Sequence, residues 1–110
     1  MKRSQQQSVA KNEAFFRGVN ETIARSAEPL YAPDEQISFV CECGHADCDE
    51  PITLARSEYE AVRQDGSTFS IVPGHFIEGA EVTIAQHPGF WVVRKIEHAG
   101  KVALDTNPRA

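Results

Sequence analysis

All three cysteines of this 110-residue chain lie within eight consecutive positions, and this clustering limits how the fold can be stabilised. The pattern is Cys-x-Cys-Gly-x-x-x-Cys, formed by Cys41, Cys43 and Cys48, with His45 inside it. An odd number of cysteines does not suit a disulfide framework, and a reducing compartment keeps cysteines as thiols or metal ligands. The fold must therefore depend on a hydrophobic core, which one domain of this length can bury.

The composition favours a soluble protein of the cytoplasm. Hydrophobic residues make up 41% of the chain and charged residues 25%, both near globular averages. No apolar run approaches the length that spans a bilayer. The first residues are basic and then glutamine-rich rather than apolar, so they do not form a signal peptide.

The charge distribution argues against nucleic acids as partners. The net charge is -5, and the segment 34–50 contains six acidic residues and no Lys or Arg. Binding to a phosphate backbone depends on clustered basic residues, which this region lacks. An acidic face keeps a protein soluble and attracts basic surfaces, so we expect the partner to be another protein.

The first half of the chain predicts one long helix followed by a strand. Apolar residues recur at spacings of three and four over residues 9–27, which predicts an amphipathic helix that turns this stripe to the core. Pro29 ends that helix. The β-branched and aromatic segment 37–41 predicts a strand whose alternation continues to Cys43. On such a strand Cys41 and Cys43 point to one face and Glu42 to the other.

The second half predicts a short helix and several strands. Ser57 as the cap, with Glu60 three residues later, begins a helix that runs to about residue 64. Strands are predicted at 68–72, 82–85, 90–96 and 101–104, with a hairpin turn at 87–89. The expected class is therefore α+β, with the N-terminal amphipathic helix and the short second helix packed on a mostly antiparallel sheet that ends in a β-meander.

This interpretation gives one domain at 9–104, with a cysteine-rich loop at 41–48 and flexible ends at 1–8 and 105–110. The predicted core consists of large apolar side chains from every element: Phe15, Phe16, Val19, Ile23, Phe39, Tyr59, Val62, Phe69, Ile71, Ile84, Trp91 and Val93.

The cysteine cluster predicts a structural zinc site. Thiolates and imidazoles are the ligands that zinc prefers, usually four in a tetrahedron. Cys41, Cys43 and Cys48 supply three ligands, and the fourth is His45 or His75. We favour His75, which follows the Pro-Gly turn after a strand, because His45 lies in a tight loop between two of the cysteines. The Cys-x-Cys spacing lies outside the common paired units, so three thiols that simply pack in the interior are the alternative.

A thiol-based redox sensor or cysteine-dependent enzyme that uses Cys41, Cys43 or Cys48 is the second hypothesis. The acidic neighbours count against it, because they raise the pKa of a thiol that needs a low one. No phosphate loop, His-Glu-x-x-His or Gly-x-Ser-x-Gly motif occurs, and no small-molecule substrate is indicated. A site of three sulfurs and one histidine is coordinatively closed, which favours a non-enzymatic regulatory or adaptor protein.

Four motifs together resemble a family of small bacterial proteins of unassigned function. They are residues 12–21, residues 39–43 with Cys48, residues 58–63 and residues 72–75. The resemblance covers residues 12–98 and implies that Cys41, Cys43, Cys48 and His75 belong to one motif set. It implies no activity. Phe76 stands where the family usually has a glutamate.

Overall fold

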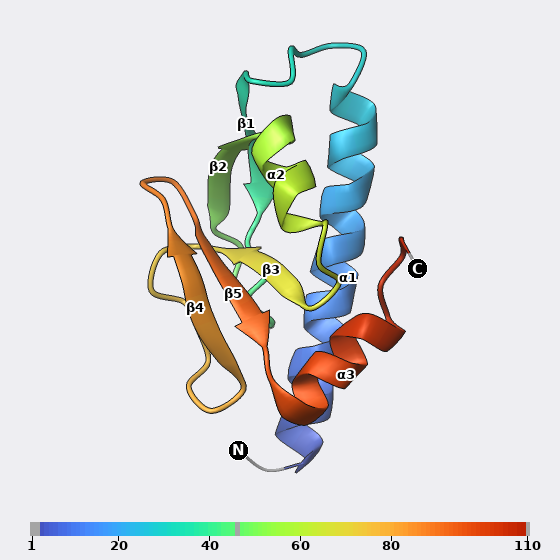
Figure 1. The fold of residues 1–110 in the computed structure, drawn as a ribbon, viewed down its shortest axis with the longest axis vertical. Helices are drawn as coiled ribbons and strands as arrows, with labels where there is room; N and C mark the ends of the chain where they lie inside the picture. Colours follow the sequence, from blue (N-terminus) through green and yellow to red (C-terminus); the bar gives the residue numbers. More distant parts are fainter. Residues whose placement is uncertain (1–2, 46, 110) are drawn as a thin grey trace.

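The computed structural model describes residues 3–45 and 47–109, with side chains from residue 8 onward. Three helices and five strands follow one another in the order α1 (Arg3–Ala27), β1 (Gln36–Val40), β2 (Pro51–Ala55), α2 (Arg56–Val62), β3 (Thr68–Ile71), β4 (Glu81–Gln86), β5 (Trp91–Lys95) and α3 (Glu97–Asp105). The predicted α+β class is confirmed. Helix α1 runs along one side of the molecule, and both sheets lie on the same side of it (Figure 1).

The strands form two separate antiparallel sheets. β1 pairs with β2, with Phe39 opposite Ile52. The other sheet has the order β3-β5-β4, and Phe69 of β3 lies opposite Val93 of β5. The predicted hairpin at 87–89 is confirmed as the β4–β5 connection. The predicted meander is wrong in its third strand, because the segment 101–104 is helical and β3 lies beside β5 instead.

The face that α1 turns to the core differs from the predicted apolar stripe. Phe15 is 67% exposed, whereas Arg17 and Asn20 are completely buried. Arg17 donates to the carbonyl oxygens of Gly66 at 2.7 Å and Ala103 at 2.8 Å, and its guanidinium lies 4.5 Å from the Phe69 ring centroid. The buried face of α1 is therefore largely polar, and its partners are supplied by distant parts of the chain.

Several core predictions are confirmed and others need correction. The structure buries Phe39, Tyr59, Val62, Phe69, Ile71 and Val93, and packs Ile23 and Trp91 against them as partly buried side chains. Phe16 and Val19 are also only partly buried. Ile84 is 42% exposed and was wrongly placed in the core. Alternation along β4 explains this, because Ile84 shares the exposed face of the strand with Val82 and Gln86.

The second helix begins earlier than predicted. Its cap is Ala55 rather than Ser57, and the helix ends at Val62. Glu58, three residues after this cap, accepts a hydrogen bond from the backbone N–H of Ala55 at 2.8 Å. Glu58 therefore has the capping role that the sequence pattern predicted for Glu60.

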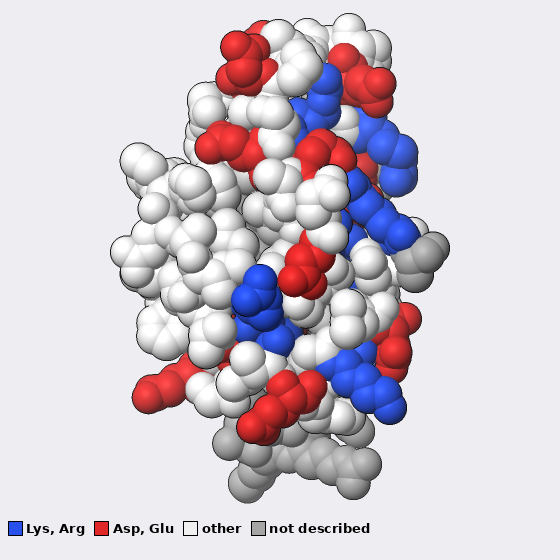
Figure 2. Space-filling view, in the orientation of Figure 1, with Lys and Arg blue, Asp and Glu red and all other residues white. Residues whose placement is uncertain are grey.

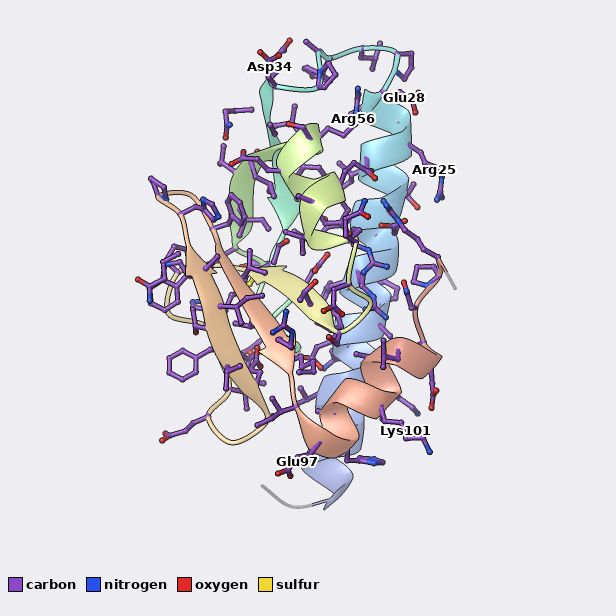
Figure 3. All side chains as sticks on the ribbon, in the orientation of Figure 1. Arg25, Glu28, Asp34, Arg56, Glu97 and Lys101 are labelled. Carbon is purple, nitrogen blue, oxygen red and sulfur yellow. The ribbon has the colours of Figure 1, made fainter. Side chains whose placement is uncertain are left out.

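The predicted strand at 101–104 is wrong, because this segment belongs to α3. Gly100, interpreted as part of a turn, instead allows a close approach: an added Cβ would lie 2.9 Å from the carbonyl oxygen of Lys95. Gly100 and Ala103 are buried, while Glu97 and Lys101 project away from the body of the molecule (Figure 3). The small residues Gly100 and Ala103 on one face of α3 thus allow it to pack closely against the rest of the chain.

The structure describes part of each predicted flexible end. The backbone is helical from Arg3, six residues before the predicted start, while Met1 and Lys2 lie outside the described residues. Near the C-terminus Arg109 pairs with Glu21 at 2.8 Å and with Glu60 at 2.7 Å, and Ala110 lies outside the description.

Charge is unevenly distributed over the surface. Figure 2 shows charged side chains over the helices and the adjoining loops, whereas the face formed by the β4–β5 hairpin is largely uncharged. Among residues 3–45 and 47–109, no helix combines the length and the apolar character that crossing a bilayer requires.

Candidate metal centre

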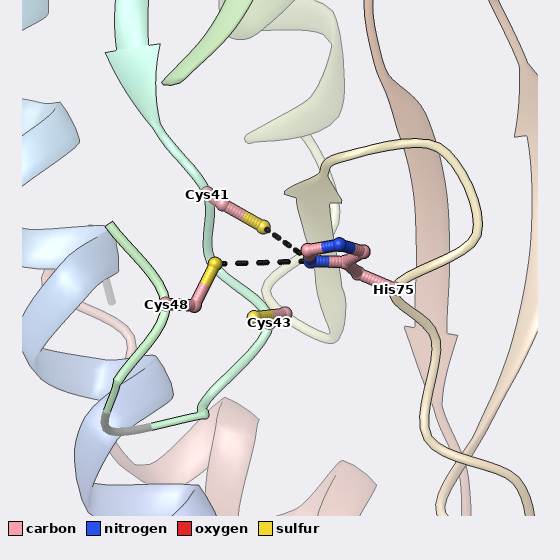
Figure 4. A group of neighbouring side chains, drawn as sticks. All are labelled: Cys41, Cys43, Cys48 and His75. Atoms are coloured by element: carbon pink, nitrogen blue, oxygen red, sulfur yellow. Dashed lines mark hydrogen bonds between the residues drawn. The ribbon is translucent and has the colours of Figure 1, made fainter. Parts of the chain in front are cut away.

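The structure brings Cys41, Cys43, Cys48 and His75 together, as the sequence predicted. One ligand atom from each lies within 4.8 Å of the other three. Figure 4 shows the three sulfurs and the imidazole turned toward a common centre from three separate segments. Ligand atoms around a tetrahedral zinc ion are about 3.4 to 3.8 Å apart, so a small contraction would complete the geometry. All three cysteines lie in the described part of the chain and are free thiols.

The Cys-x-Cys pair occupies the continuation of β1. The backbone N–H of Cys41 donates to the carbonyl oxygen of Glu50 at 3.2 Å, and that of Glu42 donates to Ser70 at 2.9 Å. The backbone N–H of Val72 points to the sulfur of Cys41 at 3.1 Å. Backbone contacts on both sides thus keep this segment extended, and alternation places both sulfurs on one face.

The loop that follows Cys43 lies against α1 at Gly44. Gly44 has φ +83, and an added Cβ would lie 2.7 Å from a Glu13 side-chain carbon, so only glycine fits. Its carbonyl oxygen accepts a hydrogen bond from the Asn12 amide at 2.9 Å. The backbone N–H of Cys48 then donates to the carbonyl oxygen of His45 at 3.1 Å. These contacts place the sulfur of Cys48 close to those of Cys41 and Cys43.

His75 is delivered by a tight turn after β3. The backbone N–H of His75 donates to the carbonyl oxygen of Val72 at 3.0 Å, and Gly74 has φ +88. Proline followed by a glycine of positive φ is typical of a type II turn. The ring nitrogen Nδ1 lies 3.9 Å from the Cys41 sulfur and 3.7 Å from the Cys48 sulfur.

The other ring nitrogen of His75 faces a carboxylate. Nε2 lies 3.7 Å from Oε2 of Glu50. A carboxylate at this position favours a proton on Nε2, which leaves the lone pair of Nδ1 for an ion. The arrangement is one that metal-binding histidines commonly adopt in proteins.

The pKa values of the three thiols are shifted in different directions. A hydrogen bond with Cys43 raises the pKa of Cys41, and the same bond lowers the pKa of Cys43 to about 4. Burial raises the pKa of Cys48. These opposite shifts favour a thiolate at Cys43 over one at Cys41, and a bound cation would displace the remaining thiol protons.

Behind the sulfurs lies a buried carboxyl group. Glu42 is completely buried and accepts hydrogen bonds from the Asn20 amide at 2.7 Å, the Tyr59 hydroxyl at 3.0 Å and the Ser70 backbone at 2.9 Å. Burial raises the pKa of Glu42, against the opposing effect of these donors. Asn20 also binds the carbonyl oxygen and the N–H of Val40, each at 2.8 Å. This network binds the backbone from the side opposite the sulfurs, and its hydrogen bonds need no ion.

The other candidate ligand, His45, is exposed and does not belong to the cluster of four. It lines a pocket of about 220 Å³ together with Cys48 and His75. The preference for His75 over His45 therefore agrees with the geometry.

Helical periodicity did not indicate the two helix residues that lie behind the site. Asn12 and Asn20 lie within an amphipathic segment where polar residues are expected to face solvent. The burial of Glu42 could have been predicted from strand alternation, which turns its side chain away from the sulfurs and toward the interior.

No protein-family model, curated protein or solved structure matches this chain.

Proposed function

We propose that the protein is a small zinc-binding protein of the cytoplasm in which the ion has a structural role. The observation that carries the proposal is the convergence of three sulfurs and one imidazole nitrogen within 4.8 Å. Three thiolates and one imidazole form one of the common ligand sets of structural zinc. A reducing compartment favours thiols that are free to bind metal.

The arrangement favours a structural role over a catalytic one. Four protein ligands fill a tetrahedral shell, whereas catalytic zinc sites use three and leave a position for water. Cys41 and Cys43 are buried at 2% and 1% exposure, so two of the ligands are closed to a substrate. The ion would tie the end of β1 to the turn after β3, two segments about thirty residues apart in sequence.

We further propose a non-enzymatic regulatory or adaptor role through contacts with another protein. Metal binding would fix the loop 41–48, and the exposed acids Asp47 and Asp49 would be held on its surface. A fixed acidic surface attracts a basic partner and gives specificity through complementary charge.

Metal content tests the proposal. The full chain would be purified without added metal and without a metal-binding tag, and its zinc determined by elemental analysis. We expect close to one zinc per chain in the wild type and in His45→Ala, and none in His75→Ala. A wild-type protein that is folded, free of metal and equally stable in chelator would contradict the proposal.

Thiol reactivity separates the zinc protein from the redox sensor. Thiols that hold a metal react with a thiol reagent only after a chelator has removed the ion. Thiols of a sensor react at once, with or without the chelator. Rapid reaction of the untreated native protein would therefore favour the second hypothesis.

A further inference from the structure

The four ligands of the candidate site differ in their access to solvent. Cys41 and Cys43 form the inner pair and are almost completely buried. Cys48 and His75 form the outer pair, are partly exposed, and line the pocket of about 220 Å³. An ion that approaches from this pocket therefore meets the outer pair first.

The rest of the pocket lining consists of His45, Asp47, Asp49 and Glu50, which we call the acidic mouth. All four are exposed. No Lys or Arg lies among the described residues that line this pocket. The mouth therefore combines three carboxylates and one imidazole, which are all groups that bind divalent cations.

We infer that the ion enters and leaves the site through the acidic mouth, held first by His45 and the outer pair and then passed inward to Cys41 and Cys43. This inference rests on the proposed metal binding and adds the route and the order of ligation. His45 takes part during transfer and is absent from the final shell.

Two physical effects support the route. Negative charges around a concave entrance concentrate cations there and raise association rates, and salt screens this effect. A histidine two residues from Cys43 can hold an ion at the entrance while the thiols lose their protons, a step that metal binding requires. Glu50 also faces Nε2 of His75, so one acid of the mouth orients an outer ligand.

Rates of Co²⁺ binding to the metal-free full chain test the electrostatic part. The mouth variant is the double variant Asp47→Asn, Asp49→Asn. Its control is the double variant Asp34→Asn, Asp105→Asn, which changes the net charge equally outside the acidic mouth. Asp34 lies at one end of the molecule (Figure 3). We expect the mouth variant to bind about three to ten times more slowly at low salt, with the difference vanishing at high salt. Equal rates in the two variants, or no effect of salt, would overturn the inference.

His45→Ala tests the transfer step. We expect this variant to slow both association and release of Co²⁺ by the same factor, so that its Kd is unchanged, because His45 is not a final ligand. Unaltered rates, or an altered Kd, would overturn this role. A wild-type chain that binds no Co²⁺ would overturn the proposed function as well, whereas normal binding at unchanged rates would overturn the route alone.

Discussion

The two sides of the backbone at residues 41–43 are almost equally buried but differ in their hydrogen bonding. Cys41 and Cys43 point to one side, and Glu42 points to the other. The carboxyl side is complete: Asn20, Tyr59 and a backbone N–H all donate to Glu42. The sulfur side gathers three thiols and an imidazole, with the Val72 N–H donating to one sulfur.

The difference indicates which part of the site depends on something beyond the chain. A buried polar group that is fully hydrogen-bonded contributes to stability by itself. Three thiols around one imidazole acquire a comparable role only when a cation replaces their protons. We therefore expect changes on the sulfur side to depend on metal and changes on the carboxyl side to be independent of it.

Removing a sulfur ligand should have the largest effect. We expect Cys43→Ser to lose the ion and to lower the free energy of unfolding by at least about 3 kcal/mol, since structural zinc binds small peptides with about 10 kcal/mol or more. Thermal unfolding with and without chelator measures this. In chelator the variant and the wild type should unfold at nearly the same temperature; a large difference that persists there would mean that the sulfur has another role.

Asn20→Ala should have the next largest effect. It removes two hydrogen bonds to Val40 and one to the buried Glu42. Unsatisfied buried groups cost about 1 to 3 kcal/mol each, so we expect a loss of about 2 to 4 kcal/mol after relaxation. Urea unfolding should give the same loss with and without chelator. A loss that appears only in the presence of metal would show that the two sides are not independent.

Tyr59→Phe should cost less, because it removes one hydrogen bond while keeping the ring that stacks on Phe39 at 4.8 Å. We expect about 1 to 2 kcal/mol from the lost donor to Glu42. Urea unfolding of the metal-loaded variant measures the loss, and its zinc content should stay at one per chain. Loss of the metal would contradict the separation of roles.

Glu42→Gln tests how the buried carboxyl group makes stability depend on pH. Burial raises the pKa of Glu42 above 4.5 in the folded chain, so the folded state holds its proton more strongly than the unfolded state does. The free energy of unfolding then falls as pH rises from about 4.5 toward the folded pKa. We expect Gln, which does not titrate, to flatten this fall, measured by urea unfolding in chelator at a series of pH values. An unchanged slope would contradict this assignment.

Local patterns predicted the site better than the surroundings that hold it. Alternation along a strand sets Cys41 and Cys43 on one face, and the Pro-Gly sequence before His75 defines a turn, so both follow from neighbouring residues. The polar face of α1 does not follow in this way. Arg17 is buried because it meets carbonyl groups 49 and 86 positions away, and no periodicity within the helix indicates such partners.

The C-terminal segment shows the same limit. The apolar residues at 102–104 suit a short strand as well as a helix, and periodicity cannot separate the two in so short a run. In the structure the segment is helical and Gly100 packs closely against the Lys95 carbonyl, a contact that exists only in the folded chain. The exposed positions of Phe15 and Ile84 likewise depend on which face of the helix or strand the rest of the folded chain covers.

X-ray absorption at the zinc edge tests the central claim most directly, because it reports the atoms bound to the ion. For the purified full chain we predict a shell of three sulfurs at about 2.3 Å and one nitrogen at about 2.0 to 2.1 Å. His75→Ala should lose the ion, and His45→Ala should keep the wild-type shell. A shell dominated by oxygen, or an unchanged shell in His75→Ala, would contradict the claim that Cys41, Cys43, Cys48 and His75 together hold the metal.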